Sequence, residues 1–511
     1  MDYQTSKEEF TQKEVVLDQT KEQAIDVDFN LPDYCPDIRQ ILKCRVLTKI
    51  NSNNILSDRL EIDGVADISV LYLDDKSTNI SVCEHSMPFN LYLPIPADTN
   101  QDAIVLTQTK SEYINCRAVS LRRLDIHGAF SVHVKILTKK TIEIVTDIEG
   151  EGLEQKKTVL TTNDIIGTGM DQFLVEESLE TQDFDESTII VRTDASTVLT
   201  NYKTEDNKVV IKGEITLKVF SAKGLEPQKF SSSDYSIPIS QAIDVTGATE
   251  NSKCEVKFDL IGYTVNKRKD SAEGNFLDVG FNIATVATVY EEHELSLIKD
   301  VYSLDCEIKP IISNIKLEKF SGILNENFQT KESIEFNNKN ISKVLDIWNE
   351  VLTLSTKQEG DMLVFFGKLN LCILALDLEK NLFYTEHLLN FEYQKPIDNA
   401  FGRAYLDAEA KIMSLAFRIA NEKNLEVRID LKISAFLYFT IELESISEIS
   451  IDNENQKEKD TAAIIIYYAD AGEEIWNIAK THNTTVEAIK TQNDLENDVL
   501  KNDSVILIPT T

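Results

Sequence analysis

The chain has 511 residues, with 52 Lys and Arg against 86 Asp and Glu, so its formal net charge at pH 7 is −34. This acidity argues against binding to DNA, RNA or an anionic membrane surface, all of which require a basic face. The length suggests three or four folding units, and 42% hydrophobic residues can give each of them a packed core.

The beginning of the sequence bears on the cellular compartment. Residues 1–10 contain neither a basic segment nor an apolar one, so we expect no secretory signal. No run approaches the roughly 18 apolar residues of a membrane-spanning helix. The 7 cysteines are scattered without a Cys-x-x-Cys pair, which is typical of reduced thiols in the cytosol.

Most of the chain consists of an internal repeat. Its first anchor is a glycine inside an alternating apolar run, at Gly64, Gly213 and Gly367. Its second anchor starts another alternating run, at Leu124, Leu277 and Leu425. Two anchors kept in register three times, with an offset of roughly 150 residues, indicate three copies of one unit.

Alternation with a period of two dominates both anchors, which predicts half-buried antiparallel strands. A glycine inside such a strand marks a bulge or a close approach of two backbones. We expect only short helices, over Pro36 to Cys44, Ser342 to Leu352 and Leu406 to Ala420. The fold class is therefore mainly β: three repeated antiparallel domains, each sandwich-like or barrel-like, and a small C-terminal module.

The composition suggests where these parts begin and end. Residues 1–28 are charged and weakly patterned, and we expect a flexible or loosely docked arm there. Residues 451–463 are polar and charged, which predicts a linker. The expected domains are 29–150, 172–296 and 298–450 for the three β units and 464–511 for the C-terminal module.

The C-terminal module reads as strand, helix, helix, strand. Ile475, Ile478 and Ala479 form one apolar helix stripe, and Thr484 to Glu487 has the spacing of a capping box before the second helix. With Gly472, Trp476, Asn493 and a closing Ile508-Pro509, residues 467–509 resemble the LysM module. The chain departs from that pattern at Glu473-Glu474 and at Asn502-Asp503.

The LysM resemblance implies a shallow groove between the loop before the first helix and the loop after the second. LysM modules generally bind polymers of N-acetylglucosamine there. In this chain the two loops carry five carboxylates, which suit a basic protein partner better than a neutral sugar: Glu473, Glu474, Asp494, Glu496 and Asp498. The candidate partner-binding residues are Ile464, Gly472, Glu473, Glu474, Ile475, Trp476, Asn493 and Leu495.

Two of these candidates have a plainer interpretation. Trp476 is either an interface anchor or a packing residue of the first helix. The run Ile464 to Ile466 places apolar groups on both faces of the first strand, where Ile464 or Ile466 either extends the partner surface or is covered by the linker.

Taken as a whole, three acidic β units followed by one LysM module resemble the SipL family of spore-coat morphogenetic proteins. The repeats are similar to its SPOCS domains, chiefly in Leu31-Pro32, Pro36-Asp37-Ile38 and Ile41-Leu42, and in the strand around Gly64. The resemblance implies an adaptor in the mother-cell cytoplasm, at the forespore surface. It would bind the coat basement ATPase, stage IV sporulation protein A, through its LysM module, and other coat proteins through the β domains.

No pattern in the sequence indicates catalysis, a metal or a cofactor. His127 and His133 are too far apart along one strand for a shared metal ion, since six residues of strand span about 20 Å. No phosphate-binding loop and no nucleophile elbow occurs. We therefore expect a scaffold and not an enzyme; the alternative is a protein that binds peptidoglycan through its LysM module.

Overall fold

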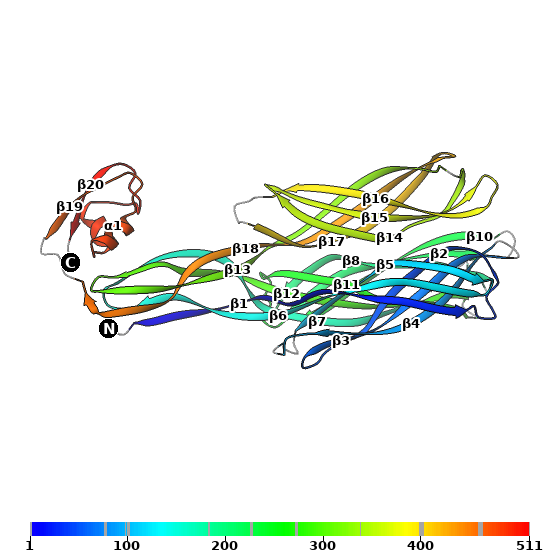
Figure 1. Cartoon of the computed structure of the whole chain (residues 1–511), viewed down its shortest axis with the longest axis horizontal. Helices are drawn as coiled ribbons and strands as arrows, with labels where there is room; N and C mark the ends of the chain where they lie inside the picture. The colour runs from blue at the N-terminus through cyan, green and yellow to red at the C-terminus, as the bar shows by residue number, and fades with distance from the viewer. Residues whose placement is uncertain are drawn as a thin grey trace.

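The computed structural model describes residues 3–75, 79–97, 99, 103–181, 184–185, 187–224, 228–270, 274–337, 339–397, 403–457 and 463–509. Within these ranges the chain forms twenty strands, β1 to β20, and two helices, α1 and α2. The strands confirm the mainly β fold. The first eighteen build a long body, and the C-terminal module lies at one end of it (Figure 1).

Three units of like strand order follow one another in the described residues. Unit one comprises β1 (Gln4–Asn30), β2 (Ile38–Ile55), β3 (Arg59–Asp74), β4 (Ile80–Pro94), β5 (Ile104–Ser120) and β6 (Arg123–Glu149). Unit two comprises β7 (Leu153–Glu180), β8 (Thr188–Glu205), β9 (Lys208–Lys223), β10 (Lys229–Asp244), β11 (Lys253–Asp270) and β12 (Gly274–Ser303). Unit three comprises β13 (Cys306–Glu335), β14 (Ile341–Glu359), β15 (Met362–Asp377), β16 (Leu382–Pro396), β17 (Arg403–Asn421) and β18 (Asn424–Gln456).

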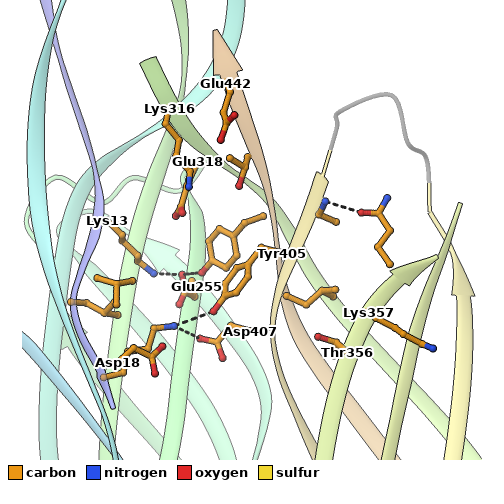
Figure 2. Close-up of a pocket in the computed structure, with 18 of the residues that line it drawn as sticks. Lys13, Asp18, Glu255, Lys316, Glu318, Thr356, Lys357, Tyr405, Asp407 and Glu442 are labelled. Atoms are coloured by element: carbon orange, nitrogen blue, oxygen red, sulfur yellow. Dashed lines mark hydrogen bonds and ion pairs between the residues drawn. The ribbon is translucent and has the colours of Figure 1, made fainter. Parts of the chain in front are cut away.

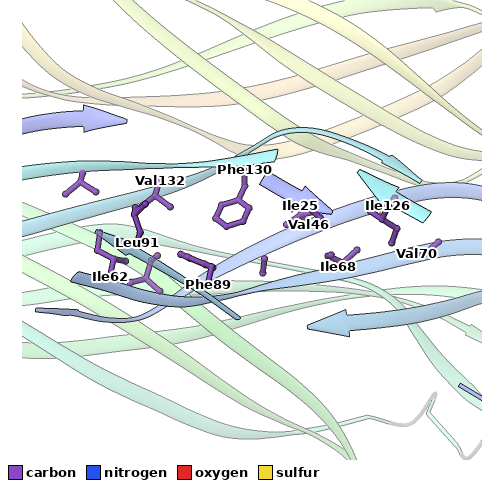
Figure 3. Packing of buried hydrophobic residues seen from close by; sticks show 14 of the residues in the cluster. Ile25, Val46, Ile62, Ile68, Val70, Phe89, Leu91, Ile126, Phe130 and Val132 are labelled. Atoms are coloured by element: carbon purple, nitrogen blue, oxygen red, sulfur yellow. The ribbon is translucent and has the colours of Figure 1, made fainter. Parts of the chain in front are cut away.

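Each unit contains two antiparallel three-stranded sheets. In unit one the sheets have the orders β1-β6-β5 and β2-β3-β4, and units two and three repeat this arrangement. The alternating apolar residues of the two sheets face each other and form one core, as Ile25, Val46, Ile68 and Phe130 do in unit one (Figure 3). Each unit is therefore a sandwich, which the sequence left open against a barrel.

The two repeat anchors lie on the central strands of these sheets. Gly64, Gly213 and Gly367 occupy β3, β9 and β15, and Leu124, Leu277 and Leu425 open the buried runs of β6, β12 and β18 with none of their surface exposed. A Cβ atom on Gly64 would lie 2.4 Å from the ring of Phe89 and 2.5 Å from the carbonyl oxygen of Lys49. The glycine therefore lets an aromatic ring and a neighbouring strand approach, as predicted.

The first and last strands of each unit continue beyond its sandwich. We call these extensions the stalk: residues 4–15, 137–149, 153–165, 290–303, 306–320 and 438–456. All three units contribute to one core inside it, where Phe10, Ile144, Leu295, Leu297 and Leu317 are almost fully buried. The three units consequently form one continuous body and not three separate domains joined by linkers (Figure 1).

Four sequence-based expectations need correction. Residues 4–30 are not an arm, because they form β1 and pair with β6 from Gln4 opposite Glu149 to Asn30 opposite Arg123. The helices expected over 36–44, 342–352 and 406–420 are absent, because these residues lie largely in β2, β14 and β17. The starts expected at 29 and 172 are too late, since they miss β1 and the first part of β7. Residues 451–456 of the expected linker continue β18, and residues 458–462 lie outside the described residues.

A buried carboxylate joins all three units where the stalk meets the sandwiches. Glu255 of unit two is 3% exposed and accepts a hydrogen bond of 2.9 Å from the Tyr290 hydroxyl. It also accepts a hydrogen bond from Lys13 of unit one (Figure 2). The Tyr438 hydroxyl of unit three donates a further hydrogen bond to it. Burial alone would raise the pKa of Glu255, but the Lys13 ammonium, the Tyr438 hydroxyl and the charge of Lys257 together outweigh burial and hold that pKa below its ordinary value.

A second polar contact joins the units beside a cavity of about 1370 Å³. Asp407 of unit three lies 2.6 Å from the Lys257 ammonium of unit two and 3.8 Å from the Lys135 ammonium of unit one. At the far end of the sandwiches, Arg192 of unit two donates two hydrogen bonds, of 2.9 and 2.8 Å, to Asp346 of unit three. Charged contacts of this kind fix the orientation of the units because an unpaired charge in either place would be costly.

Candidate functional site

The C-terminal module has the predicted order of strand, helix, helix and strand. It comprises β19 (Ile464–Ala469), α1 (Ile475–Thr481), α2 (Val486–Gln492) and β20 (Ser504–Pro509), and β19 pairs with β20 in antiparallel fashion. The side chain of Thr485 caps α2 by accepting a hydrogen bond of 3.0 Å from the amide of Ala488. The cap is therefore one residue later than the box expected from Thr484.

Three of the candidate residues stabilise the module from within. Ile475 is completely buried, and Leu495 packs against the same core. Asn493 bridges α2 and β20: its amide group donates to the carbonyl oxygens of Ile489 and Leu507, at 2.8 and 2.7 Å, and its side-chain oxygen accepts from the Leu507 amide at 2.7 Å. These residues shape the module and offer little surface to a partner.

The two loops expected to form a groove are bonded to each other. Gly472 has a φ of +92°, which favours glycine, and its amide donates to the Leu500 carbonyl oxygen at 2.8 Å. The Leu500 amide donates in turn to the carbonyl oxygen of Glu473 at 2.9 Å. The Ile475 amide donates to the carbonyl oxygen of Asp498, also at 2.9 Å. The structure thus brings Gly472 and Glu473 beside the loop that follows α2.

Trp476 faces the stalk and not the solvent. It is 8% exposed, its indole Nε1 donates a hydrogen bond of 2.8 Å to Asp300 at the end of β12, and its ring stands edge-on to Tyr302 with 4.9 Å between centroids. Lys480, one turn further along α1, contacts both carboxylate oxygens of Asp300 at 2.8 Å. Trp476 is a packing residue here, against the chain's own second unit.

Further bonds hold the module on the stalk. Glu474 accepts a hydrogen bond of 2.5 Å from Lys156 of β7, and the Tyr302 hydroxyl donates to the Thr484 carbonyl oxygen at 2.7 Å. Lys457, just after β18, donates to the side-chain oxygen of Asn483 at 2.7 Å. We call these contacts, together with those of Trp476 and Lys480, the clamp.

Ionisation of the clamp residues follows from their surroundings. Partial burial acts to raise the pKa of Asp300, but hydrogen bonds from Lys480 and Trp476 outweigh it and hold that pKa below its ordinary value. Burial raises the pKa of Glu154 on the stalk, and the nearby charge of Glu487 on α2 raises it further. The clamp thus holds Asp300 as a paired carboxylate, and a pair of like charges, Glu154 and Glu487, lies near it.

The outer face of the β19–β20 sheet is apolar and uncovered. Ile464, Ile466 and Tyr468 alternate along β19 and are 48%, 61% and 79% exposed, and Val505, opposite Tyr468 on β20, is 53% exposed. The other face of the same strands packs onto the helices through residues such as Ile465 and Ile506. We call the exposed side, with these four residues, the outer face.

The candidate set thus divides into a few exposed residues and several structural ones. Ile464 lies on the outer face, whereas Glu474 and Trp476 belong to the clamp. Sequence reasoning considered Ile466 but missed Tyr468 and Val505, although the alternation of Ile464, Ile466 and Tyr468 was a readable signal. It also missed Asp300 and Tyr302, which no local pattern connects with the C-terminal module.

In the described part of the chain, neither helix has the length and apolar character that a membrane crossing requires. The described residues also contain no cluster of three or more His, Cys, Asp or Glu side chains placed to hold a metal ion.

Comparison with known proteins identifies two kinds of domain in the chain. The profile of the SipL, SPOCS domain family matches residues 37–119 and 188–268, which lie in units one and two, and the LysM domain profile matches residues 470–509. No curated protein and no solved structure shows significant similarity to the chain. Both matched families are binding domains, and their combination agrees with the resemblance to SipL-like proteins inferred from the sequence. The chain therefore contains two segments that match the SPOCS domain of the SipL family, followed by a C-terminal LysM domain, and in this combination it is similar to SipL-like proteins.

Proposed function

We propose that this protein is a non-enzymatic spore-coat morphogenetic adaptor. Its LysM domain binds the coat basement ATPase, stage IV sporulation protein A, and its SPOCS body carries or recruits other coat proteins. It acts in the mother-cell cytoplasm and promotes assembly of the coat around the forespore. The family matches support a role in the spore coat, and the arrangement of the LysM domain supports binding to a protein.

The outer face is the observation that carries this proposal. Four large apolar side chains, each about half or more exposed, lie on one sheet at the end of the molecule: Ile464, Ile466, Tyr468 and Val505. A contiguous apolar surface of this kind gains free energy when a protein partner covers it. Its position beyond the stalk leaves room for a large partner (Figure 1).

The charge of the LysM domain points to the nature of that partner. Asp494, Glu496 and Asp498 are exposed on the loop after α2, and Lys490 lies 2.8 Å from Asp498. Such carboxylates steer a basic protein surface towards the domain, whereas a neutral sugar gains nothing from their net charge. The apolar outer face then supplies affinity, and the acidic loop supplies specificity.

The experiment compares full-length variants for binding to purified stage IV sporulation protein A and to N-acetylglucosamine oligomers. Joint replacement of Ile466 and Tyr468 by alanine should weaken binding to the ATPase at least tenfold, because central apolar contacts carry most of the affinity. Leu388→Ala is the matched control, since Leu388 is 61% exposed on β16, far from the LysM domain. It should change the affinity by less than about twofold.

Two results would contradict the proposal. One is unchanged ATPase binding by the double variant with an unchanged thermal transition. The other is saturable binding of the sugar oligomers by a wild-type protein that does not bind the ATPase, which would support the peptidoglycan-binding alternative.

A further inference from the structure

The LysM domain has two surfaces with large apolar side chains, and the chain itself covers one of them. The outer face is open, whereas the α1 side, with Trp476, is packed against Tyr302 and Asp300 of the stalk. We propose that the clamp is a reversible autoinhibitory contact: it masks Trp476 and Glu474, and the LysM domain reaches its full affinity for the partner only after leaving the stalk. This regulation rests on the proposed function.

The LysM domain can leave the stalk without unfolding. Its own residues supply most of its core: Ile475, Ala479, Ile489 and Ile508 are fully buried and Ile506 nearly so, and all five belong to one cluster. Among the described residues, Tyr302 of the stalk and Leu304, directly after β12, are the residues of the body that join that core. Undocking therefore uncovers a small area and leaves the fold of the domain in place.

The composition of the clamp suits a contact that opens. It depends mainly on polar bonds, and one carboxylate, Asp300, accepts from both Trp476 and Lys480. Water can replace such bonds when the surfaces part, so they contribute modestly to the closed state. The like charges of Glu154 on β7 and Glu487 on α2 repel each other, which favours opening.

Opening would uncover residues of the types that dominate protein interfaces. Trp476 and Tyr302 are the two aromatic side chains of the clamp, and tryptophan and tyrosine are enriched among binding hot spots. Glu474 would exchange Lys156 for a cation of the partner. A partner that uses these groups has to compete with the stalk. Its apparent affinity is therefore its affinity for the open form multiplied by the fraction of molecules in which the clamp is open.

The test uses full-length protein in which Trp348 is replaced by Phe, so that Trp476 is the remaining one of the 2 tryptophans. Asp300→Ala should open the clamp, and Asp28→Ala is the matched control, because Asp28 pairs with Arg123 on β6 rather than with the LysM domain. Acrylamide quenching of Trp476 fluorescence reports on masking. Hydrogen exchange of residues 296–303 reports on the stalk side of the contact. It is measured with Trp348 left in place, so the result does not depend on Trp348→Phe.

Asp300→Ala should increase the quenching constant severalfold and speed exchange at 296–303, and it should bind stage IV sporulation protein A up to about tenfold more tightly. Asp28→Ala should match wild type in all three measurements. Equal quenching and exchange in wild type and Asp300→Ala would overturn the clamp. An opened variant that binds the ATPase no more tightly than wild type would overturn the masking. Failure of wild type and variant alike to bind would overturn the proposed partner together with its regulation, whatever the quenching shows.

Discussion

Removal of the Lys13 ammonium should destabilise the junction of the three units more than any surface substitution. Lys13→Met keeps the length of the side chain but leaves the Glu255 carboxylate, 3% exposed, without its cation. An uncompensated buried charge of this kind costs about 3–5 kcal/mol. Since about 1.4 kcal/mol corresponds to a factor of ten, opening of β1 at this point should become roughly 10²–10⁴ times more frequent.

Native-state hydrogen exchange of the β1 segment around Lys13 measures this opening directly. Lys140→Met is the matched control, because Lys140 pairs with Glu14 in the same part of the sheet but both side chains are about half exposed, at 48% and 43%. It should change exchange by less than tenfold. Adding Glu255→Gln to Lys13→Met should restore most of the protection, since the amide oxygen still accepts from the tyrosines without carrying a charge.

The reasoning fails if Lys13→Met and Lys140→Met exchange alike. It also fails if Glu255→Gln brings no recovery in the Lys13→Met background, because the buried charge would then not be the cause of the loss.

Three more predictions concern the packing, the LysM domain and pH. Gly64→Ala should lower the free energy of unfolding of unit one by about 1–3 kcal/mol in a urea titration, because the new Cβ would overlap the Phe89 ring. Gly280→Ala is the control: its Cβ would have its nearest neighbour atom at 3.1 Å, so it should lower the free energy of unfolding by less. Asn493→Ala should speed hydrogen exchange in β20 but not in the stalk, because it removes the bridge between α2 and β20; equal acceleration in both would contradict this assignment. The pKa of Glu255 is held below its ordinary value of about 4.3, so its contribution to stability is present above that pH and is lost as the pH falls through the lowered pKa. The stability gap between wild type and Lys13→Met should accordingly narrow on acidification, and a gap that is constant from pH 7 to pH 3 would refute this.

The sequence revealed the central strands of the fold and obscured the outer ones. β3, β9 and β15, like β6, β12 and β18, have neighbours on both edges and run through the cores, so their apolar alternation is regular and repeats three times. β1 lies at a sheet edge, where its charged side chains remain in water, and its composition therefore resembled that of a mobile arm. Helical spacing in β2, β14 and β17 arose from register shifts, for example between Ile41 and Lys43, which interrupt the strand alternation.

In the candidate site, too, the sequence predicted local patterns but not contacts between distant parts of the chain. The LysM domain was recognised because its pattern is local, from Gly472 to Pro509. The role of Trp476 was not, because its partner Asp300 is 176 residues away and single-sequence patterns carry no information about such contacts. Glu255 was missed for the same reason: Lys13 and Tyr438 approach it from the two ends of the chain.

The pairing of β1 with β6 has a consequence for the nascent chain. Gln4 finds its partner only at Glu149, so β1 must wait for almost the whole of unit one to leave the ribosome. At about 5–20 residues per second, this delay lasts roughly ten seconds or more. An unpaired strand is an aggregation hazard during such a wait, and the frequent Lys and Glu residues of β1 are suited to suppress it. The charged residues that made β1 resemble a mobile arm in the sequence thus protect it from aggregation during synthesis, until β6 is available to pair with it.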